Sequence, residues 1–416
     1  MTAAILRLGR RTFASLEHRN YRLFFAGQVV SLAGTWMQNT ALAWTIVELT
    51  HSPFAVGVLA FFRFIPFTVL GLVAGVIADR VDNRRLVIGA QTAQMAVSAA
   101  LAVLAFAGEL RTWQVYALAA LGGIAVVFEA PGRHALTFQM VGRDELPNAV
   151  ALNASLLNGA RVVGPALAGA VIAGGGVSWC FALNTVSFLA VLASLLAMRE
   201  RELVPLDRGA ESPTMVHGVR EALGFARRSQ EVRLVLGITA IVSTVGFNFN
   251  VLVPILASDT LRAGPEVFGI ISACFGAGAL SGALLTAGFR RASSTWLLAG
   301  TAGFGVTLLA LAPLRNVAAA AALLFATGVF YTLWSANSNA ILQLASPDRL
   351  RGRVLSLYLF AFIGLAPLGG LLAGWLADVG GTQLAFGVAG GVSLAATVVA
   401  LASIGVRLPL RMAARP

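Results

Sequence analysis

The sequence predicts an all-α membrane protein of about twelve transmembrane helices, and three of its features lead to this fold class. Of its 416 residues, 58% are hydrophobic and only 12% are charged, whereas a soluble domain carries about 25% charged residues. Its apolar residues form separate runs close to the roughly 20 residues that a helix needs to cross a bilayer. Its basic residues fall between these runs. Lipid is therefore the expected solvent for most of the chain.

The apolar runs are too long and too continuous for β-barrel strands, so each predicts a helix. A predicted N-terminal six-helix bundle, 23–198, contains the runs Leu23–Leu49, Pro53–Ala78, Leu86–Ala107, Trp113–Phe138, Ala149–Ala173 and Val177–Met198. A predicted C-terminal six-helix bundle, 234–406, contains Leu234–Ala257, Phe268–Phe289, Trp296–Leu314, Val317–Leu344, Val354–Ala377 and Leu384–Val406. Residues 1–22 and 407–416 are the expected cytoplasmic arm and tail.

A polar linker, 199–233, joins the two predicted bundles. It contains Pro205 and Pro213, and then a basic amphipathic segment, Met215–Arg233. Such a segment is typical of a helix that lies along the membrane surface. A solvated tether is the alternative.

The arginines predict the orientation of the chain in the membrane. Apart from three within apolar runs, only three lie in loops after odd-numbered runs, namely Arg111, Arg262 and Arg315. All others are near the termini or in loops after even-numbered runs, which places both termini in the cytoplasm. No short apolar region with a cleavage site follows Arg10 and Arg11, so the arm is expected to stay uncleaved. The expected location is a bacterial-type inner (plasma) membrane.

Composition and residue types exclude several functions. Membrane topology explains the net charge of +12 better than nucleic-acid binding does. All 30 basic residues are arginine, so the chain has no phosphate-loop lysine and no Schiff-base lysine. Cys180 and Cys274 stand apart, and the four histidines are scattered, so we expect neither a metal site nor an enzyme. No cofactor is expected, and the expected partners are a small-molecule substrate and membrane lipids, with the protein a monomer.

An internal repeat divides the chain into two halves. Residues Gln139–Leu146 match Gln343–Leu350 at an offset of 204, and Pro165 matches Pro367 at an offset of 202. A repeat of half the chain is typical of transporters built from two six-helix units.

The loop between the second and third runs carries a resemblance to a known family. It reads Gly75-Val76-Ile77-Ala78-Asp79-Arg80-Val81-Asp82-Asn83-Arg84-Arg85. This resembles the signature loop of the major facilitator superfamily, with one more residue before the arginine pair. The resemblance implies the major facilitator fold of two pseudo-symmetric six-helix bundles. It also implies a cytoplasmic gate, formed by Gly75, Asp79, Arg80, Arg84 and Arg85.

Physical chemistry is consistent with a gate at this loop. Gly75 allows close approach of a neighbouring helix. A carboxylate at Asp79 is favoured by a helix N-terminus and by nearby arginines. The corresponding place in the second half has Gly282 and Arg290–Arg291 without an acid, so its gate is expected to be degenerate.

The fifth run carries a second motif, Gly159-Ala160-Arg161-Val162-Val163-Gly164-Pro165-Ala166-Leu167-Ala168-Gly169. It resembles the motif of exporter branches of the superfamily, which implies that Gly159, Gly164, Pro165 and Gly169 pack helices together. We expect the eighth run to be the neighbour, through Gly276, Gly278 and Gly282; generic glycine-rich packing is the alternative. Further matches, at 20–24, 146–149 and 153–156, are similar to the exporter group that contains enterobactin exporters and macrolide efflux proteins.

Glu129 and Arg161 are the expected proton-coupling residues. An ionisable residue inside a span is a candidate for function because its burial is costly, and Glu129 is the only acid well inside a predicted run. Helical rise places Glu129 and Arg161 at similar depths, so they could pair, with Arg133 as a competing partner four residues after Glu129. A fixed structural salt bridge is the alternative to proton coupling.

Polar and aromatic residues inside the runs are the expected substrate-binding residues. In the superfamily that the chain resembles, helices 1, 4, 7 and 10 surround a central cavity. The candidates are Gln28, Thr35, Asn39, Arg63, Glu129, Arg161, Phe247, Asn248, Tyr331 and Trp334. Aromatic side chains suit an amphipathic ligand, and the excess of arginine over acid favours an acidic one. Hydrogen bonding between helices is the alternative role of any polar residue in this set.

Together these features predict a secondary active transporter that exports a small amphipathic molecule, such as a siderophore or drug-like compound. Alternating access with proton antiport is the expected mechanism. A transporter of lysophospholipids or other lipid-like molecules is one alternative. A non-transporting membrane sensor or scaffold on a transporter fold is another.

Overall fold

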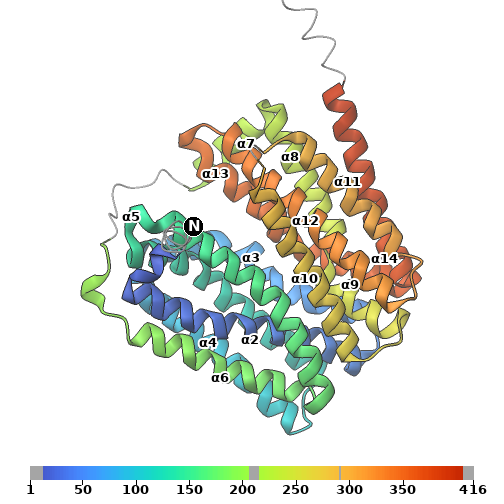
Figure 1. Ribbon diagram of the computed structural model, residues 1–416, viewed down its shortest axis with the longest axis horizontal. Helices are drawn as coiled ribbons and strands as arrows, with labels where there is room; N and C mark the ends of the chain where they lie inside the picture. The colour runs from blue at the N-terminus through green and yellow to red at the C-terminus, as the bar shows by residue number, and fades with distance from the viewer. Residues whose placement is uncertain (1–12, 206–214, 290–291, 406–416) are drawn as a thin grey trace, which may run out of the picture.

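Two groups of long helices face each other in the computed structural model (Figure 1). The structure describes residues 13–205, 215–289 and 292–405, and within them it does not describe the side chains of 72, 79, 215–219 and 404–405. We call the described residues 13–205 the N-half and 215–405 the C-half. The described residues contain helices and no strand. The ends of the arm and tail predicted from the sequence, 1–12 and 406–416, lie outside the described residues.

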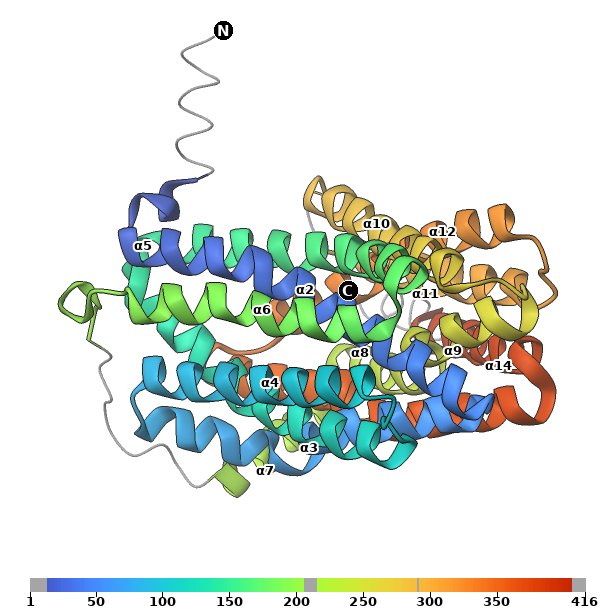
Figure 2. The same ribbon diagram turned by 90° about the horizontal axis from the view of Figure 1, so that it is seen from below.

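The helices of the N-half run side by side in Figure 2. They are η1 (Ala14–Glu17), α2 (Arg19–Thr50), α3 (Pro53–Arg80), α4 (Asn83–Phe106), α5 (Thr112–Gly175), α6 (Val177–Leu196) and η2 (Glu200–Glu202). Polar side chains start several helices by accepting a backbone N–H, which leaves fewer amides unpaired. Ser52 accepts from Ala55 at the start of α3, and Asp82 accepts from Arg85 at the start of α4.

The C-half contains more and shorter elements. They are α7 (Met215–Arg228), α8 (Gln230–Ile241), η3 (Val242–Gly246), α9 (Phe249–Ile255), η4 (Leu256–Thr260), α10 (Pro265–Ala287), α11 (Ser294–Leu311), α12 (Val317–Ala345), α13 (Asp348–Leu359), η5 (Phe360–Gly364) and α14 (Ala366–Gly405). The predicted amphipathic segment of the linker is shorter than expected. α7 ends at Arg228, because Ser229 caps the start of α8.

Two long helical segments each contain two membrane spans: α5, and the segment Asp348–Ser403 that α13, η5 and α14 form together. Gly142 interrupts α5 with φ 73°, and Gly381 interrupts α14 with φ 67°. Only glycine adopts this left-handed region without a steric penalty. Among the described residues, nine helical segments are long and apolar enough to span a membrane, and two of these contain the double spans. With α2, whose polar face lowers its hydropathy, the helices provide the twelve spans that the sequence predicts.

The seventh span is broken in its middle. α8 passes into the π-helical turn η3, after which Phe247 and Asn248 leave the helical conformation before α9 begins. A π-helical turn commonly marks a functional position. Here it directs Phe247 to Tyr331 of α12, whose ring it stacks on with centroids 4.5 Å apart.

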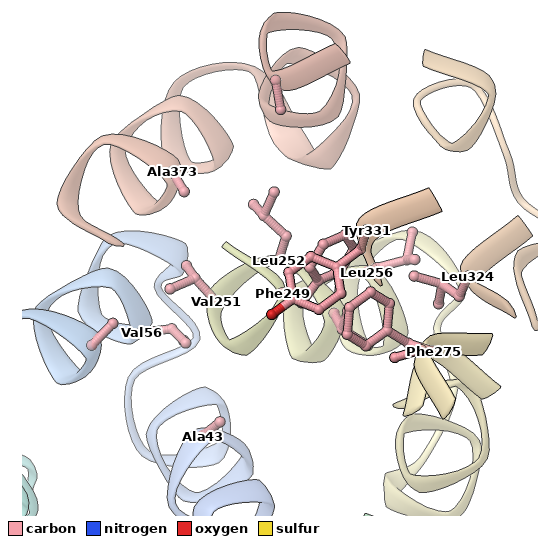
Figure 3. Packing of buried hydrophobic residues seen from close by; sticks show 14 of the residues in the cluster. Ala43, Val56, Phe249, Val251, Leu252, Leu256, Phe275, Leu324, Tyr331 and Ala373 are labelled. Carbon is pink, nitrogen blue, oxygen red and sulfur yellow. The ribbon is translucent and has the colours of Figure 1, made fainter. Parts of the chain in front are cut away.

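The two halves touch on the side of the loops after odd-numbered spans, the predicted periplasmic side. A methyl group added at Gly57 of α3 would stand 3.1 Å from Cα of Gly374 in α14. One added at Gly169 of α5 would stand 3.0 Å from Cα of Gly269 in α10. In Figure 3, Val251 of α9 lies between Val56 of α3 and Ala373 of α14. These glycines allow helices from opposite halves to approach closely.

Contact between the halves decreases toward the predicted cytoplasmic side. Within the described residues two hydrogen bonds join the halves, from Ser52 to Asp378 at 3.4 Å and from Thr68 to the carbonyl oxygen of Gly364 at 2.7 Å. Further along α3, a methyl group at Gly75 would meet nothing within 4 Å. The close approach predicted for Gly75 is thus absent from this conformation.

α10 carries glycines on two faces, and this corrects one prediction from the sequence. Gly276 approaches the backbone of Arg161 in α5, as expected. Gly278 and Gly282, however, face Phe325 and Val329 of α12. Positions 276 and 278 lie about 200° apart around a helix with 3.6 residues per turn, so they cannot serve the same neighbour.

Candidate functional site

The interior of the N-half contains a cavity of about 110 Å³, which we call the N-half cavity. Five helices surround it: α2, α3, α4, the first span of α5, and α6. Its polar lining residues are Thr35, Gln38, Asn39, Arg63, Gln94 and Asn184. Three of the predicted substrate-binding residues, Thr35, Asn39 and Arg63, are therefore together in one cavity.

A hydrogen-bond network holds one wall of this cavity. The carboxamide oxygen of Gln38 accepts from the Ser98 hydroxyl at 2.6 Å and from the Asn184 amide at 2.7 Å. These three residues come from α2, α4 and α6, so the network joins three helices. Polar bonds of this kind contribute about 0.6 kcal/mol each to helix association in a membrane.

Glu129 lies next to this cavity and is 7% exposed. The amide of Gln94, which lines the cavity, donates to the carboxylate of Glu129 at 2.8 Å. The guanidinium Nε of Arg133 lies 3.6 Å from the other carboxylate oxygen. Of the two arginines that the sequence offered as partners, Arg133 is therefore the one in contact, because both residues share one helix face at spacing i,i+4.

Arg161 lies elsewhere, at the junction of the two halves. Its guanidinium carbon stands 5.1 Å from the ring centre of Trp36 in α2 and 5.9 Å from that of Tyr331 in α12. Both distances are within the range of cation–π attraction. Its buried Nε has no hydrogen-bond partner among the described residues. The predicted contact of Arg161 with Glu129 is not formed, since the guanidinium is held between two aromatic rings.

The interior of the C-half is aromatic. Tyr331 stacks on Phe247 and contacts Phe275, Phe362 and Trp334 at centroid distances of 5.7 to 6.3 Å. Figure 3 shows Phe249, Phe275 and Tyr331 close together. We call this group the C-half aromatic cluster; its members are Phe247, Phe249, Phe275, Phe304, Tyr331, Trp334, Tyr358 and Phe362.

Three other predicted substrate-binding residues, Gln28, Asn248 and Trp334, are buried. The Asn248 amide donates to the carbonyl oxygen of Thr244 at 2.8 Å. Trp334 is fully buried, and its indole N–H has no partner among the described residues. Gln28 is 2% exposed, also has an unpaired amide nitrogen, and does not line the N-half cavity.

One residue of the predicted cytoplasmic gate, Arg84, forms its contacts within the N-half. Arg84 donates to the carbonyl oxygens of Leu195 and Leu196 at the end of α6 and pairs with Glu200. Arg80 and Arg85 are exposed. The side chain of Asp79 lies outside the described residues.

Near the predicted cytoplasmic side of the C-half, one acid pairs with two arginines. Glu221 of α7 pairs with Arg349 and Arg353 of α13. This attaches the linker helix to the C-half.

The exporter-type motif of α5 contacts two different helices. Gly164 approaches Trp36 and Met37 of α2, and Gly169 approaches α10. A methyl group at Gly159 would meet nothing within 4 Å, and Pro165 is buried. The motif therefore packs α5 against both halves of the molecule.

The polar stripe of the first run also included Gln38, but the sequence analysis did not select Gln94 and Asn184 as site residues, although they line the N-half cavity. Gln94 and Asn184 lie on α4 and α6, the third and sixth spans, which were not expected to face a substrate. A polar residue inside an apolar run was the available signal. Among the described residues, no three His, Cys, Asp or Glu side chains lie close enough to hold a metal ion.

Comparisons with known proteins agree with this architecture. The profile of the transmembrane secretion effector family matches residues 10–414. The macrolide efflux protein A of Streptococcus pyogenes is 24% identical over 87% of this chain and 91% of its own. The staphyloferrin A transporter of Staphylococcus aureus is 25% identical over 91% of this chain and 94% of its own. The enterobactin exporter EntS of Shigella boydii is 25% identical over 85% of each.

Solved structures share the fold. A POT family transporter in complex with a thioalcohol-conjugated peptide superposes with a TM-score of 0.75 at 11% identity, covering 94% of this chain and 96% of that one. The nucleoside transporter NupG superposes with a TM-score of 0.70 at 13% identity, covering 92% and 98%. The predicted fold class of twelve helices in two six-helix bundles is thereby confirmed.

Proposed function

Because the chain belongs to the transmembrane secretion effector family of the major facilitator superfamily, we propose that it exports a small amphipathic molecule, a siderophore or drug-like compound, by alternating access. It does so as a secondary active transporter coupled to proton influx, in an inner membrane with both termini in the cytoplasm. The names of its relatives, which include macrolide, siderophore and multidrug exporters, support this class of cargo.

The observation that carries the proposal is the position of Arg161, whose guanidinium lies between aromatic rings of the two halves and has a buried Nε without a hydrogen-bond partner among the described residues. An amphipathic molecule needs both kinds of surface: hydrogen-bonding groups for its polar part and rings for its apolar part. Trp36 of the N-half and Tyr331 of the C-half lie on the same guanidinium. A cargo bound there touches both halves, so it can respond to their relative movement.

The contacts between the halves suggest which conformation is present. On the proposed orientation, Gly57 and Gly169 join the halves at the periplasmic side. Gly75 has no neighbour within 4 Å on the cytoplasmic side. This is an inward-facing state, ready to take a molecule from the cytoplasm. Closure of the cytoplasmic side brings the signature loop, with Asp79 and Arg80, toward the C-half.

Glu129 is the residue proposed to carry the proton. When it is ionised, its carboxylate attracts Arg133 and accepts from Gln94. A proton on the carboxyl group removes that charge and weakens both contacts. Gln94 also lines the N-half cavity, so protonation of Glu129 changes the cavity wall. This gives proton binding a direct physical route to the cargo site.

Proton flux in proteoliposomes tests the proposal. Wild-type protein, Glu129→Gln and the control Glu109→Gln, which changes an exposed acid, are reconstituted with a pH-sensitive dye inside. A carboxylate-bearing siderophore and a macrolide are added separately. We expect a cargo-dependent flux in the wild type and in Glu109→Gln, and a loss of about 100-fold or more in Glu129→Gln, because general acid–base groups contribute about this much.

Each outcome is informative. Cargo binding that persists in Glu129→Gln without flux supports coupling at this residue. Equal flux in Glu129→Gln and wild type makes the Glu129–Arg133 pair structural. Absence of flux with both compounds contradicts proton-coupled export of this cargo class and favours a lipid-like cargo.

A further inference from the structure

Arg63 is a cation inside the membrane without an acidic partner. It lies ten residues into α3, where a charge is costly unless something compensates it. Among the described residues it forms no salt bridge and no hydrogen bond; its one polar interaction is with the neighbouring ring of Phe64, at 5.3 Å. Two acids on the neighbouring helices α5 and α2 are engaged elsewhere, Glu129 by Gln94 and Arg133, and Glu48 by the indole of Trp44. No acidic side chain among the described residues therefore neutralises the charge of Arg63.

The N-half cavity in front of Arg63 contains further hydrogen-bonding groups without partners. Thr35 and Asn39 line the cavity, and no hydrogen bond joins the Thr35 hydroxyl or the Asn39 amide to a described residue. Gln38 uses its carboxamide oxygen twice, and its amide nitrogen has no partner among the described residues. All three residues lie on α2 and line the same cavity as Arg63. The cavity thus combines one cation with unpaired groups that can donate hydrogen bonds, and it presents no free carboxylate.

Two glycines of α5 help to form the cavity. A methyl group at Gly123 would overlap the backbone carbonyl oxygen of Arg63, so α5 and α3 approach each other here as closely as their backbones allow. At the neighbouring Gly122, which lines the cavity, a methyl group would meet only the Val97 side chain, at 3.8 Å. Absence of a side chain at Gly122 therefore leaves room that a larger residue would fill.

We propose that the N-half cavity is a subsite for a carboxylate group of the exported molecule, with Arg63 as its cation. A planar guanidinium binds the two oxygens of a carboxylate side by side, and the α2 groups supply further donors. A volume of about 110 Å³ accommodates a carboxylate with a few carbon atoms, since a cavity of about 150 Å³ holds benzene. This inference rests on the proposed export function and narrows its cargo to molecules that carry a carboxylate.

Binding of radiolabelled citrate to purified full-length protein in nanodiscs tests the subsite. Acetate, chloride and the uncharged triethyl citrate serve as competitors. We expect acetate to displace citrate at a lower concentration than chloride does, and triethyl citrate not to compete. Competition by chloride equal to that by acetate would overturn the assignment to a carboxylate.

Four variants locate the binding. We expect Arg63→Gln to weaken citrate binding about ten-fold or more, the loss typical of a charge-assisted hydrogen bond. Arg63→Lys keeps the charge but not the paired geometry and should give an intermediate loss. Gly122→Val fills the cavity from another helix without changing any charge, and should weaken binding like Arg63→Gln. Arg315→Gln removes an exposed loop arginine and should leave binding within about two-fold of wild type.

The outcomes separate this inference from the proposed function. Wild-type affinity in both Arg63→Gln and Gly122→Val would overturn the subsite, and so would absence of citrate binding to the wild type. Cargo-dependent proton flux in a protein that does not bind citrate removes the subsite and leaves export standing. Arg63-dependent citrate binding in a protein without flux supports the subsite and removes proton-coupled export.

Discussion

The interior of the N-half has a cavity with polar lining residues, whereas the interior of the C-half contains a cluster of packed aromatic rings. The internal repeat makes the difference visible at matched positions. At the offset of 204, Glu129 and Arg133 correspond to Leu333 and Asn337. The ion pair of α5 is replaced in α12 by a hydrogen bond from the Asn337 amide to the carbonyl oxygen of Leu333, at 2.8 Å. The two halves thus share a helix at this position, but the paired side chains are charged in the N-half and uncharged in the C-half.

This difference suggests that the two halves have different roles. Charged groups that need a partner, Arg63 and Glu129, are in the half with hydrogen-bonding residues around them. The C-half offers large rings that pack on one another and, under the proposed function, on the cargo. Arg161 contacts both halves, since Trp36 and Tyr331 lie on its guanidinium. The comparison predicts that the two halves respond differently to equivalent substitutions.

The largest effect is expected from a glycine in the tightly packed half. A methyl group at Gly278 would overlap the carbonyl oxygen of Phe325. Gly278→Ala should therefore destabilise the protein by about 3 kcal/mol, at the upper end for overpacking. Gly122→Ala in the N-half has its nearest neighbour at 3.8 Å and should be nearly neutral. Unfolding in SDS, followed by circular dichroism, measures both; equal losses would contradict the difference in packing.

An effect of similar size is expected from the centre of the aromatic cluster. Trp334 is fully buried and contacts Phe304, Tyr331 and Phe362. Trp334→Ala leaves a cavity and should cost about 3 kcal/mol of unfolding free energy, at the lower end for truncating a buried aromatic side chain. Trp334→Phe keeps a ring and removes no described hydrogen bond, so it should cost about 1 kcal/mol or less. Thermal unfolding followed by circular dichroism ranks the two; a Phe variant as unstable as the Ala variant would show that the indole N–H matters.

The smallest effect is expected from the polar network of the N-half. Gln38→Leu removes the acceptor of Ser98 and Asn184 and should cost about 1–2 kcal/mol. Gln28→Leu is the matched control on the same helix. Its amide nitrogen is buried without a partner, so replacing it should be neutral or stabilising. The two variants are compared by unfolding in SDS, and a greater loss at Gln28 would show that its amide has a role that the network does not reveal.

The sequence predicts part of the candidate site well. Thr35, Asn39 and Arg63 were selected because polar residues in apolar runs are costly, and they line one cavity. Phe247 and Tyr331 were selected on separate spans and stack on each other. The contact between Glu129 and Arg161 was the less accurate expectation. Equal depth in the membrane does not determine the direction in which two side chains point around their helices.

By itself the sequence determined the number of spans, their lengths and the division into two halves. Each of these depends on local hydropathy, because the thickness of the bilayer requires about 20 apolar residues per helix. The tertiary structure alone decided that Glu129 contacts Gln94 and Arg133, and that Gly278 faces α12. These contacts depend on the rotation and crossing of helices, which are set by close packing at small residues from distant parts of the chain. No single apolar run contains that information.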